Sequence, residues 1–158
     1  MNIILVEGMD GAGKTTFIEN LRSIGETVYA HLTFKDVQDQ PNAVLRYTNL
    51  FDLYKDTTDT LILDRGWYSD IVYGIVLRGK ADVAYAELRA IERAAMGYGQ
   101  LSIFFLSTSV ETAWKRCQTR GEDLIKDKAT LKLVAGTYAS EIKCAKEHSP
   151  ALIYEVRT

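Results

Sequence analysis

The sequence predicts an α/β fold in which a parallel β-sheet is covered by helices on both faces. Short apolar runs of strand length alternate along the chain with segments whose apolar residues recur at helical spacing. A glycine-rich loop separates the first run from the first helix, and a later apolar run, residues 60–64, ends in a carboxylate. Because alternating strands and helices build a parallel sheet through right-handed crossovers, we expect five parallel strands in a three-layer sandwich.

The first half of the chain is expected to supply three of these strands. Strands are indicated by apolar or β-branched runs, and helices by apolar residues three or four positions apart. In chain order the expected elements are a strand at 2–6, a helix at 14–24, a strand at 27–32, a loop at 33–42, a helix at 43–55 and a strand at 60–64. Gly25 ends the first helix, and the polar run 56–59 ends the second.

The second half is expected to add two strands and the longest helix. Apolar residues on most faces of 66–77 indicate a largely buried helix, and the polar run 118–128 has no period. The remaining expected elements are a helix at 84–97, a strand at 101–106, a helix at 110–117, a helix at 131–145 and a strand at 151–156. Ser109 is placed to cap the helix that follows it.

Residues Gly8 to Thr15 have the spacing G-x-x-x-x-G-K-[ST] of a phosphate-binding P-loop. In such a loop successive backbone N–H groups form an anion site, and the N-terminus of the following helix also favours phosphate. Lys14 is expected to reach the β- and γ-phosphates, and the Thr15 hydroxyl to ligate Mg²⁺. The fold class is therefore a P-loop NTPase. The alternative, a glycine-rich turn that carries a lysine by chance, fits poorly between a strand and a helix.

Composition points to a single globular domain. The chain has 158 residues, 47% of them hydrophobic, and only two prolines, so we expect one domain over residues 1–158. A net charge of −2 opposes nucleic acid or an anionic membrane as a partner. No leader and no apolar run of membrane-spanning length is expected, which predicts a cytoplasmic protein. Cys117 and Cys144 lack metal-ligand spacing and are expected to be reduced thiols.

A second chemical landmark is the pair Asp64-Arg65 at the end of the third expected strand. In P-loop enzymes an acid at this place holds Mg²⁺ or its waters, so Asp64 is a candidate metal ligand. The Arg65 guanidinium can grip a phosphate with two parallel hydrogen bonds. The alternative is structural: Asp64 caps the next helix and Arg65 pairs with it.

The motifs together resemble those of the thymidylate kinase family, the deoxynucleoside monophosphate kinases. The segment 7–16, Asp64-Arg65 with Ser69 and Tyr73, and Arg116 with the run 120–122 follow the family's order and span most of the chain. The resemblance implies a nucleoside-monophosphate-kinase fold with strand order 2-3-1-4-5, ATP as donor and dTMP as the usual acceptor. It also favours a homodimer, and the compact length suits a viral or phage member.

The resemblance also implies roles for individual residues. Asp10 would contact the deoxyribose 3′-hydroxyl, Arg65 would hold the acceptor phosphate, and Tyr73 would lie against the sugar and disfavour a 2′-hydroxyl. Arg116 and Arg120 match arginines of a lid, expected at about 118–128, that covers adenine and clamps the transferred phosphoryl group. The expected ATP-binding residues are Gly8, Asp10, Gly11, Ala12, Gly13, Lys14, Thr15, Thr16 and Arg116.

Two departures leave the acceptor open. The family often carries an arginine after the second strand, where this chain has Lys35, a single ammonium in place of a guanidinium fork. Arg46 is the best candidate for the base-reading arginine, but no phenylalanine stands one turn before it. The acceptor could therefore be dTMP, or it could be dUMP, dCMP, dGMP or a modified pyrimidine nucleotide.

A related family is the deoxyribonucleoside kinases, which the run 67–70 also resembles. In that family the last aspartate reads the base, which makes Trp67 and Asp70 candidate substrate contacts; the alternative is that Asp70 is a solvated helical aspartate. A neutral 5′-hydroxyl acceptor benefits from a carboxylate base, for which Asp36 is the candidate here. A monophosphate is already ionised and needs cations, and Lys35 and Arg65 provide them, so we favour a monophosphate acceptor.

Two further hypotheses lie outside small-molecule kinases. One is a kinase that acts on a modified base within DNA, which the net charge opposes. The other is a nucleotide-binding regulator without turnover, which would need no second anion clamp. We favour direct in-line transfer, with Lys14, Asp64, Arg65 and Arg120 as the catalytic residues.

Overall fold

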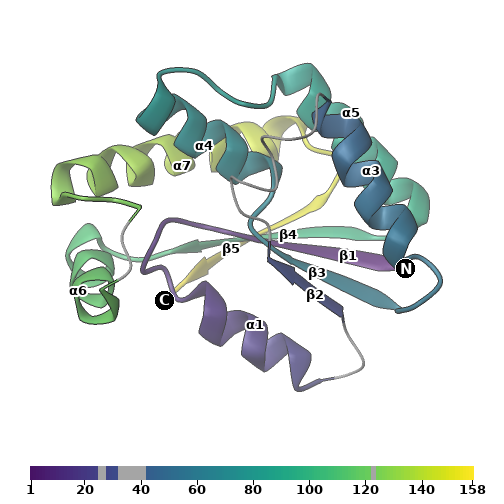
Figure 1. Cartoon of the computed structure of the whole chain (residues 1–158), viewed down its shortest axis with the longest axis horizontal. Helices are drawn as coiled ribbons and strands as arrows, with labels where there is room; N and C mark the ends of the chain where they lie inside the picture. Colours follow the sequence, from purple (N-terminus) through teal and green to yellow (C-terminus); the bar gives the residue numbers. More distant parts are fainter. Residues whose placement is uncertain (25–27, 32–41, 122–123) are drawn as a thin grey trace.

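A computed structural model describes residues 1–24, 28–31, 42–121 and 124–158. Its centre is a parallel sheet of five strands in the order β2-β3-β1-β4-β5 (Figure 1). The strands are β1 (Asn2–Glu7), β2 (Val28–His31), β3 (Thr60–Asp64), β4 (Leu101–Ser107) and β5 (Leu152–Arg157). The predicted α/β class with a parallel sheet is confirmed, and the strand order is the one that the resemblance implies.

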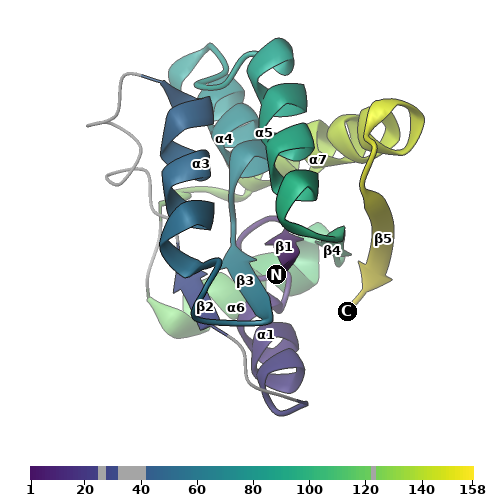
Figure 2. The ribbon, with the colours of Figure 1, turned by 90° about the vertical axis from the view of Figure 1, so that its right-hand side faces the viewer.

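The helices form a layer on each side of this sheet. They are α1 (Lys14–Arg22), α3 (Ala43–Tyr54), α4 (Trp67–Arg78), α5 (Tyr85–Tyr98), α6 (Val110–Arg120) and α7 (Lys128–His148). Helices α1 and α6 lie on one side, and α3, α4, α5 and α7 lie on the other (Figure 1, Figure 2). This is the covering on both faces that strands buried from end to end require.

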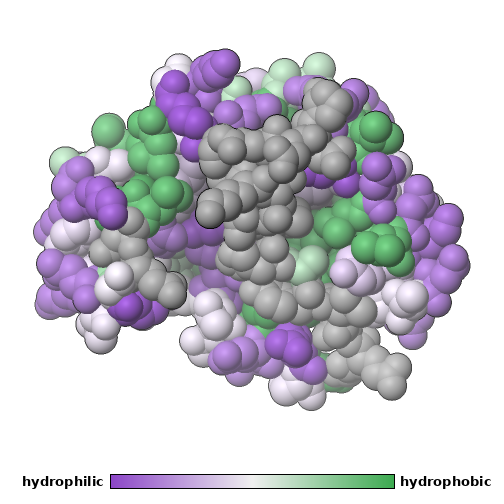
Figure 3. Space-filling view, in the orientation of Figure 1, coloured by the Kyte–Doolittle hydropathy of each residue, from purple (hydrophilic) through white to green (hydrophobic). Residues whose placement is uncertain are grey.

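The core sits around the two central strands. The side chains of Ile3, Leu5, Leu61 and Leu63 are fully buried, and each residue of β1 from Asn2 to Val6 has a partner in β3. In contrast, Leu152 and Tyr154 of the edge strand β5 are nearly half exposed. On the face seen in Figure 3, hydrophilic side chains cover much of the described surface and hydrophobic ones gather in separate places. None of the described helices is both long and apolar enough to cross a membrane.

The expected loop at 118–128 is shorter than the sequence suggested. Helix α6 continues through Arg120 and ends at Gly121, whose φ of 68° is the left-handed conformation that favours glycine at a helix C-terminus. Helix α7 already begins at Lys128, because the Asp127 side chain accepts a hydrogen bond from the Thr130 N–H and caps it. These helical ends were not predicted, because their residues are polar and show no apolar spacing.

Candidate active site

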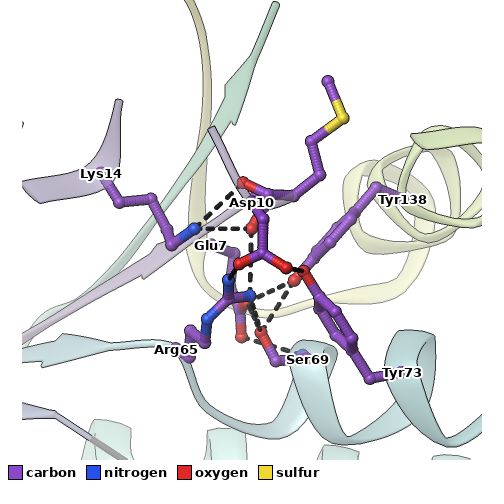
Figure 4. A network of polar contacts seen from close by, with 9 residues as sticks. Glu7, Asp10, Lys14, Arg65, Ser69, Tyr73 and Tyr138 are labelled. Carbon is purple, nitrogen blue, oxygen red and sulfur yellow. Dashed lines mark hydrogen bonds and ion pairs between the residues drawn. The ribbon is translucent and has the colours of Figure 1, made fainter. Parts of the chain in front are cut away.

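The two chemical landmarks of the sequence meet at one edge of the sheet. Strands β1 and β3 are parallel neighbours, with Val6 paired to Asp64. The P-loop follows β1 and the Asp64-Arg65 pair ends β3, so both lie at the carboxyl edge of the sheet, where α/β proteins bind ligands. Figure 4 shows the polar side chains that gather there.

The P-loop backbone needs its glycines. Gly8, Gly11 and Gly13 have φ values of 147°, 77° and 85°, which side chains rarely allow. A Cβ on Gly8 would stand 2.5 Å from the carbonyl oxygen of Leu106, and one on Gly11 would collide with the backbone of Ala113. Gly13 precedes α1 and no side chain caps that helix, so the positive end of its dipole faces the loop.

Lys14 is buried beneath this loop. Its ammonium donates hydrogen bonds to the carbonyl oxygens of Gly8 (2.9 Å) and Met9 (3.1 Å). Burial, together with the nearby Arg65 cation, lowers the pKa of Lys14 to about 7. The charges of Asp10, Asp64 and Glu7 offset these effects only in part. A bound polyphosphate would add negative charge beside this ammonium and favour its charged form, as the predicted role of Lys14 requires.

Arg65 has an unusual backbone, with a φ of 72° that makes it the one non-glycine residue with positive φ among those described. Such a conformation costs about 1–3 kcal/mol and persists only where surrounding contacts hold it. The Arg65 N–H donates to the carbonyl oxygen of Val6 (3.0 Å), and its guanidinium donates to the carbonyl oxygen of Gly8 (3.2 Å). The side chain therefore lies over the P-loop (Figure 4).

The guanidinium of Arg65 is held on two further sides. Asp10 of the P-loop forms an ion pair with it, and the ring of Tyr73 lies beneath it, 4.9 Å from its central carbon. The other carboxylate oxygen of Asp10 accepts a hydrogen bond from the Tyr73 hydroxyl (3.1 Å). Three residues that the resemblance assigned to the acceptor, one in the P-loop and two after β3, therefore form one cluster.

Glu7, Ser69 and Tyr138 form a buried layer next to this cluster. Ser69 and Tyr138 donate hydroxyl hydrogen bonds to Glu7, and their own oxygens are 2.7 Å apart. Sequence reasoning assigned no role to Glu7 or Tyr138. Glu7 was detectable, because it ends a buried strand with a carboxylate as Asp64 does. Tyr138 gave no local signal, because only the packing of α7 on α4 brings it here.

The proposed metal ligands provide oxygen donors at the mouth of the P-loop. Asp64 is buried at the end of β3, close enough to Lys14 for its charge to raise the pKa of that lysine against the effect of burial. Thr15 and Thr16 are exposed in the first turn of α1. Carboxylate and hydroxyl oxygens suit Mg²⁺, which usually binds proteins through a few such ligands and a substrate phosphate. The donor set therefore fits the predicted cofactor.

A second ion pair lies between α3 and α4. Arg46 and Asp70 are 2.9 Å apart, and the Tyr47 hydroxyl donates to the same carboxylate oxygen (2.8 Å). Burial raises the pKa of Asp70 to about 6, although the charge of Arg46 opposes the shift. Asp70 is only 11% exposed, so the alternative of a solvated helical aspartate is wrong. Trp67 is fully buried edge-on against Tyr47, and its direct contact with substrate stays a prediction.

The expected lid arginines lie on α6, apart from the cluster of Asp10, Arg65 and Tyr73. Arg116 donates to the carbonyl oxygen of Gly11 (3.0 Å), and beside it the Thr158 hydroxyl donates to that of Ala12 (2.8 Å). Arg120 is exposed in the last turn of the helix. Thr158 was not anticipated, because a residue after the last strand carries no motif. Lys35, Asp36 and Glu122 lie outside the described residues, and their roles stay predictions.

No family model and no curated protein matches the sequence, but solved structures match the fold. The YorR protein from Bacillus subtilis, in complex with phosphorylated GDP, has a TM-score of 0.72 and 18% identity over 98% of this chain and 85% of its own. Deoxyadenosine kinase from M. mycoides with bound dATP has a TM-score of 0.65 and 15% identity over 98% of this chain and 90% of its own. The same kinase with products dCMP and dCDP has a TM-score of 0.59.

At these identities the likeness concerns the fold. The chain shares its fold with the YorR protein and with deoxyadenosine kinase, and the likeness does not single out thymidylate kinase.

Proposed function

We propose that this protein is an ATP-dependent kinase that phosphorylates a deoxynucleoside monophosphate, with dTMP as the leading acceptor. The observation that carries the proposal is the position of Arg65, whose guanidinium lies over the P-loop between Gly8 and Asp10. Phosphoryl transfer between two nucleotides needs cations for both sets of phosphates. Lys14 is suited to the donor and Arg65 to the acceptor.

The ion pair with Asp10 supports this assignment. A guanidinium that is 82% buried would be costly without an anion, and Asp10 supplies one. Asp10 is also 28% exposed, so its partner can be approached from solvent. An acceptor phosphate would replace the carboxylate at Arg65, which leaves Asp10 to accept a hydrogen bond from the sugar 3′-hydroxyl.

The proposed mechanism is direct in-line transfer. Thr15 and Asp64 would hold Mg²⁺, which neutralises charge on the β- and γ-phosphates when bound. Lys14 would follow the migrating charge, Arg65 would fix the acceptor, and Arg120 would close over the transferred group. Most of the rate acceleration would then come from positioning and preorganised charge. The proposal includes one kinase domain over residues 1–158, a lid at about 118–128 and a homodimer.

The test is an ADP-release assay with Mg²⁺, ATP and a panel of deoxynucleosides and their monophosphates. We expect turnover with dTMP or another pyrimidine monophosphate and almost none with nucleosides, because a nucleoside leaves the Arg65 cation without an anion. Lys14→Met is the control that separates this activity from a contaminating kinase. ATP binding without ADP release for every acceptor would contradict the proposal and favour a regulator.

The Arg46–Asp70 pair favours a second candidate, a deoxyribonucleoside kinase. A buried carboxylate held by one arginine and one tyrosine can present its remaining lone pairs to a base edge. Two of the similar structures described above are of a deoxyadenosine kinase. In that case a carboxylate, with Asp36 as candidate, would have to accept the 5′-hydroxyl proton. Efficient turnover of thymidine or deoxycytidine in the same panel would put this candidate first.

A further inference from the structure

Two glutamates of the described chain have fully buried side chains, Glu7 and Glu92. A buried carboxylate is retained only where hydrogen bonds offset its lost hydration. Burial also raises the pKa of Glu7, against the hydrogen bonds and the positive charge of Arg65. Packing alone therefore does not explain a glutamate at position 7. Its hydrogen-bond partners show which part of the structure it holds.

Both oxygens of Glu7 accept from the start of α4 (Figure 4). One oxygen accepts from the backbone N–H groups of Gly66 (2.9 Å) and Ser69 (3.1 Å). The other accepts from the hydroxyls of Ser69 and Tyr138. Gly66 precedes α4 and has no side chain of its own to cap the helix. A carboxylate from strand β1 thus serves as the N-cap of α4.

This cap lies next to the left-handed turn at Arg65. The Arg65 N–H binds the carbonyl oxygen of Val6, and the following N–H, that of Gly66, binds the Glu7 carboxylate. Two consecutive backbone groups are thereby tied to two consecutive residues of β1. A strained φ persists where such contacts over-determine it, and here the turn directs the guanidinium over the P-loop.

We propose that Glu7 is a positioning residue, which holds the backbone turn at Arg65 and so keeps the guanidinium where an acceptor phosphate can bind. The inference rests on the proposed function, because it assigns the acceptor to Arg65. Tyr138 takes part through its hydroxyl, which connects Glu7 to the helix that follows the expected lid.

The central test compares Glu7→Gln with Glu92→Gln. The amide keeps the size of the side chain but removes the negative charge that faces Arg65 and the α4 N-terminus, and it reverses the hydrogen bonds of the Ser69 and Tyr138 hydroxyls, which would have to accept from its NH2 group. Glu92 is an equally buried glutamate that accepts from the Tyr68 hydroxyl (2.8 Å) and from Arg89 (2.6 Å), away from the P-loop. Its substitution costs stability without reaching Arg65.

We expect Glu7→Gln to raise the KM for the acceptor by about tenfold or more while the KM for ATP changes less than about twofold. Glu92→Gln should leave both constants unchanged in the folded fraction. Equal changes in the two KM values, or the same acceptor effect in Glu92→Gln, would show a general structural role and overturn the inference.

A milder pair covers the case in which Glu7→Gln does not fold. Tyr138→Phe removes one hydroxyl from Glu7, and Tyr85→Phe removes a hydroxyl that donates to the buried Glu141 (2.6 Å) on the same helix α7. The expected result is a rise in acceptor KM of about threefold in Tyr138→Phe alone. No difference between the two variants would contradict the inference.

A readout on the ligand-free protein separates this inference from the proposed function. The Arg65 guanidinium signal in ¹⁵N NMR, assigned with Arg65→Lys, should show a restrained side chain in the parent and in Glu92→Gln, and a mobile one in Glu7→Gln. If the parent phosphorylates no acceptor, the proposed function fails, and this signal still reports on Glu7. If the parent is active and neither the signal nor the acceptor KM changes in Glu7→Gln, the positioning role is wrong.

Discussion

The proposed acceptor side and the proposed lid side of the site differ in how firmly their arginines are held. Arg65, on the acceptor side, is 82% buried and contacts Asp10, Gly8 and the ring of Tyr73. Arg120, on the lid side, is exposed at the end of α6. A long side chain loses more than about 1 kcal/mol of rotamer entropy when it is fixed. That cost is already met for Arg65, whereas Arg120 would lose this freedom only on closure.

The difference predicts two kinds of mutational effect. Changes on the preformed side should alter the binding of one substrate, because their contacts exist before the reaction begins. Changes on the lid side should lower kcat, because their contacts would form only as the site closes. Lys14 belongs to both, since it lies between the two sides and would contact the transferred group.

The largest effect is expected for Lys14→Met. Removal of a charge that strengthens its interaction in the transition state should lower kcat by about 10³-fold, while the fold survives. Steady-state kinetics together with thermal unfolding check this. A kcat near that of the parent would show that Lys14 takes no part in the reaction, which would contradict the proposed mechanism.

Arg120→Ala sharpens the comparison from the lid side. We expect kcat to fall by about 10²-fold and the Kd for ATP to change little, because the exposed side chain would act only on the transferred phosphoryl group. Lys115→Ala, a loss of an exposed cation from the same helix, is the matched control. If Arg120→Ala weakens ATP binding as much as it lowers kcat, the residue docks the donor and the lid is not the part that closes.

Tyr73 tests the preformed side with a smaller effect. Tyr73→Ala removes the ring beneath Arg65 and should reduce discrimination between deoxyribose and ribose acceptors by about tenfold, since the ring proposed to disfavour a 2′-hydroxyl is lost. Tyr73→Phe keeps the ring and loses only the hydrogen bond to Asp10, so discrimination should survive. Unchanged kcat/KM ratios for the two sugars in Tyr73→Ala would make Tyr73 a core residue only.

The smallest expected effect is a change in the protonation of Lys14 when ATP binds. Because burial lowers the pKa of Lys14 to about 7, most of this amine is neutral at pH 8, and a bound polyphosphate should restore the ammonium. Calorimetry in buffers of different ionisation enthalpy should therefore detect proton uptake on ATP binding at pH 8, absent in Lys14→Met. Linkage has a matching sign: from pH 7 to about 10.5 only the unfolded chain protonates Lys14, so its contribution to stability rises with pH.

The fold class and part of the site could be predicted from the sequence, and each part was predictable for its own physical reason. Residues Gly8 to Thr15 carry their geometry locally, because a left-handed glycine or a lysine at a fixed spacing needs no distant partner to be recognised. The carboxylate Asp64 was also predictable, since a buried strand that ends in an acid places it at the carboxyl edge of the sheet.

The remaining contacts depend on packing that no local pattern encodes. Tyr138 reaches Glu7 from 131 residues away, and Arg46 meets Asp70 only because α3 packs beside α4. The end of α6 was missed for a different reason. Its last three residues are all polar, so helix capping by Gly121, and not apolar spacing, decides where it ends.

The most direct test of the account is the affinity of the ligand-free protein for dTMP relative to thymidine, measured by calorimetry in the parent and in Arg65→Met. If Arg65 is a preformed clamp for the acceptor phosphate, the parent should bind dTMP about 100-fold more tightly than thymidine, the value of one strong charge-assisted contact. In Arg65→Met the ratio of the two affinities should fall to about one. Equal affinities in the parent, or a ratio that Arg65→Met leaves intact, would contradict the central claim that the acceptor side is built in advance to hold a monophosphate.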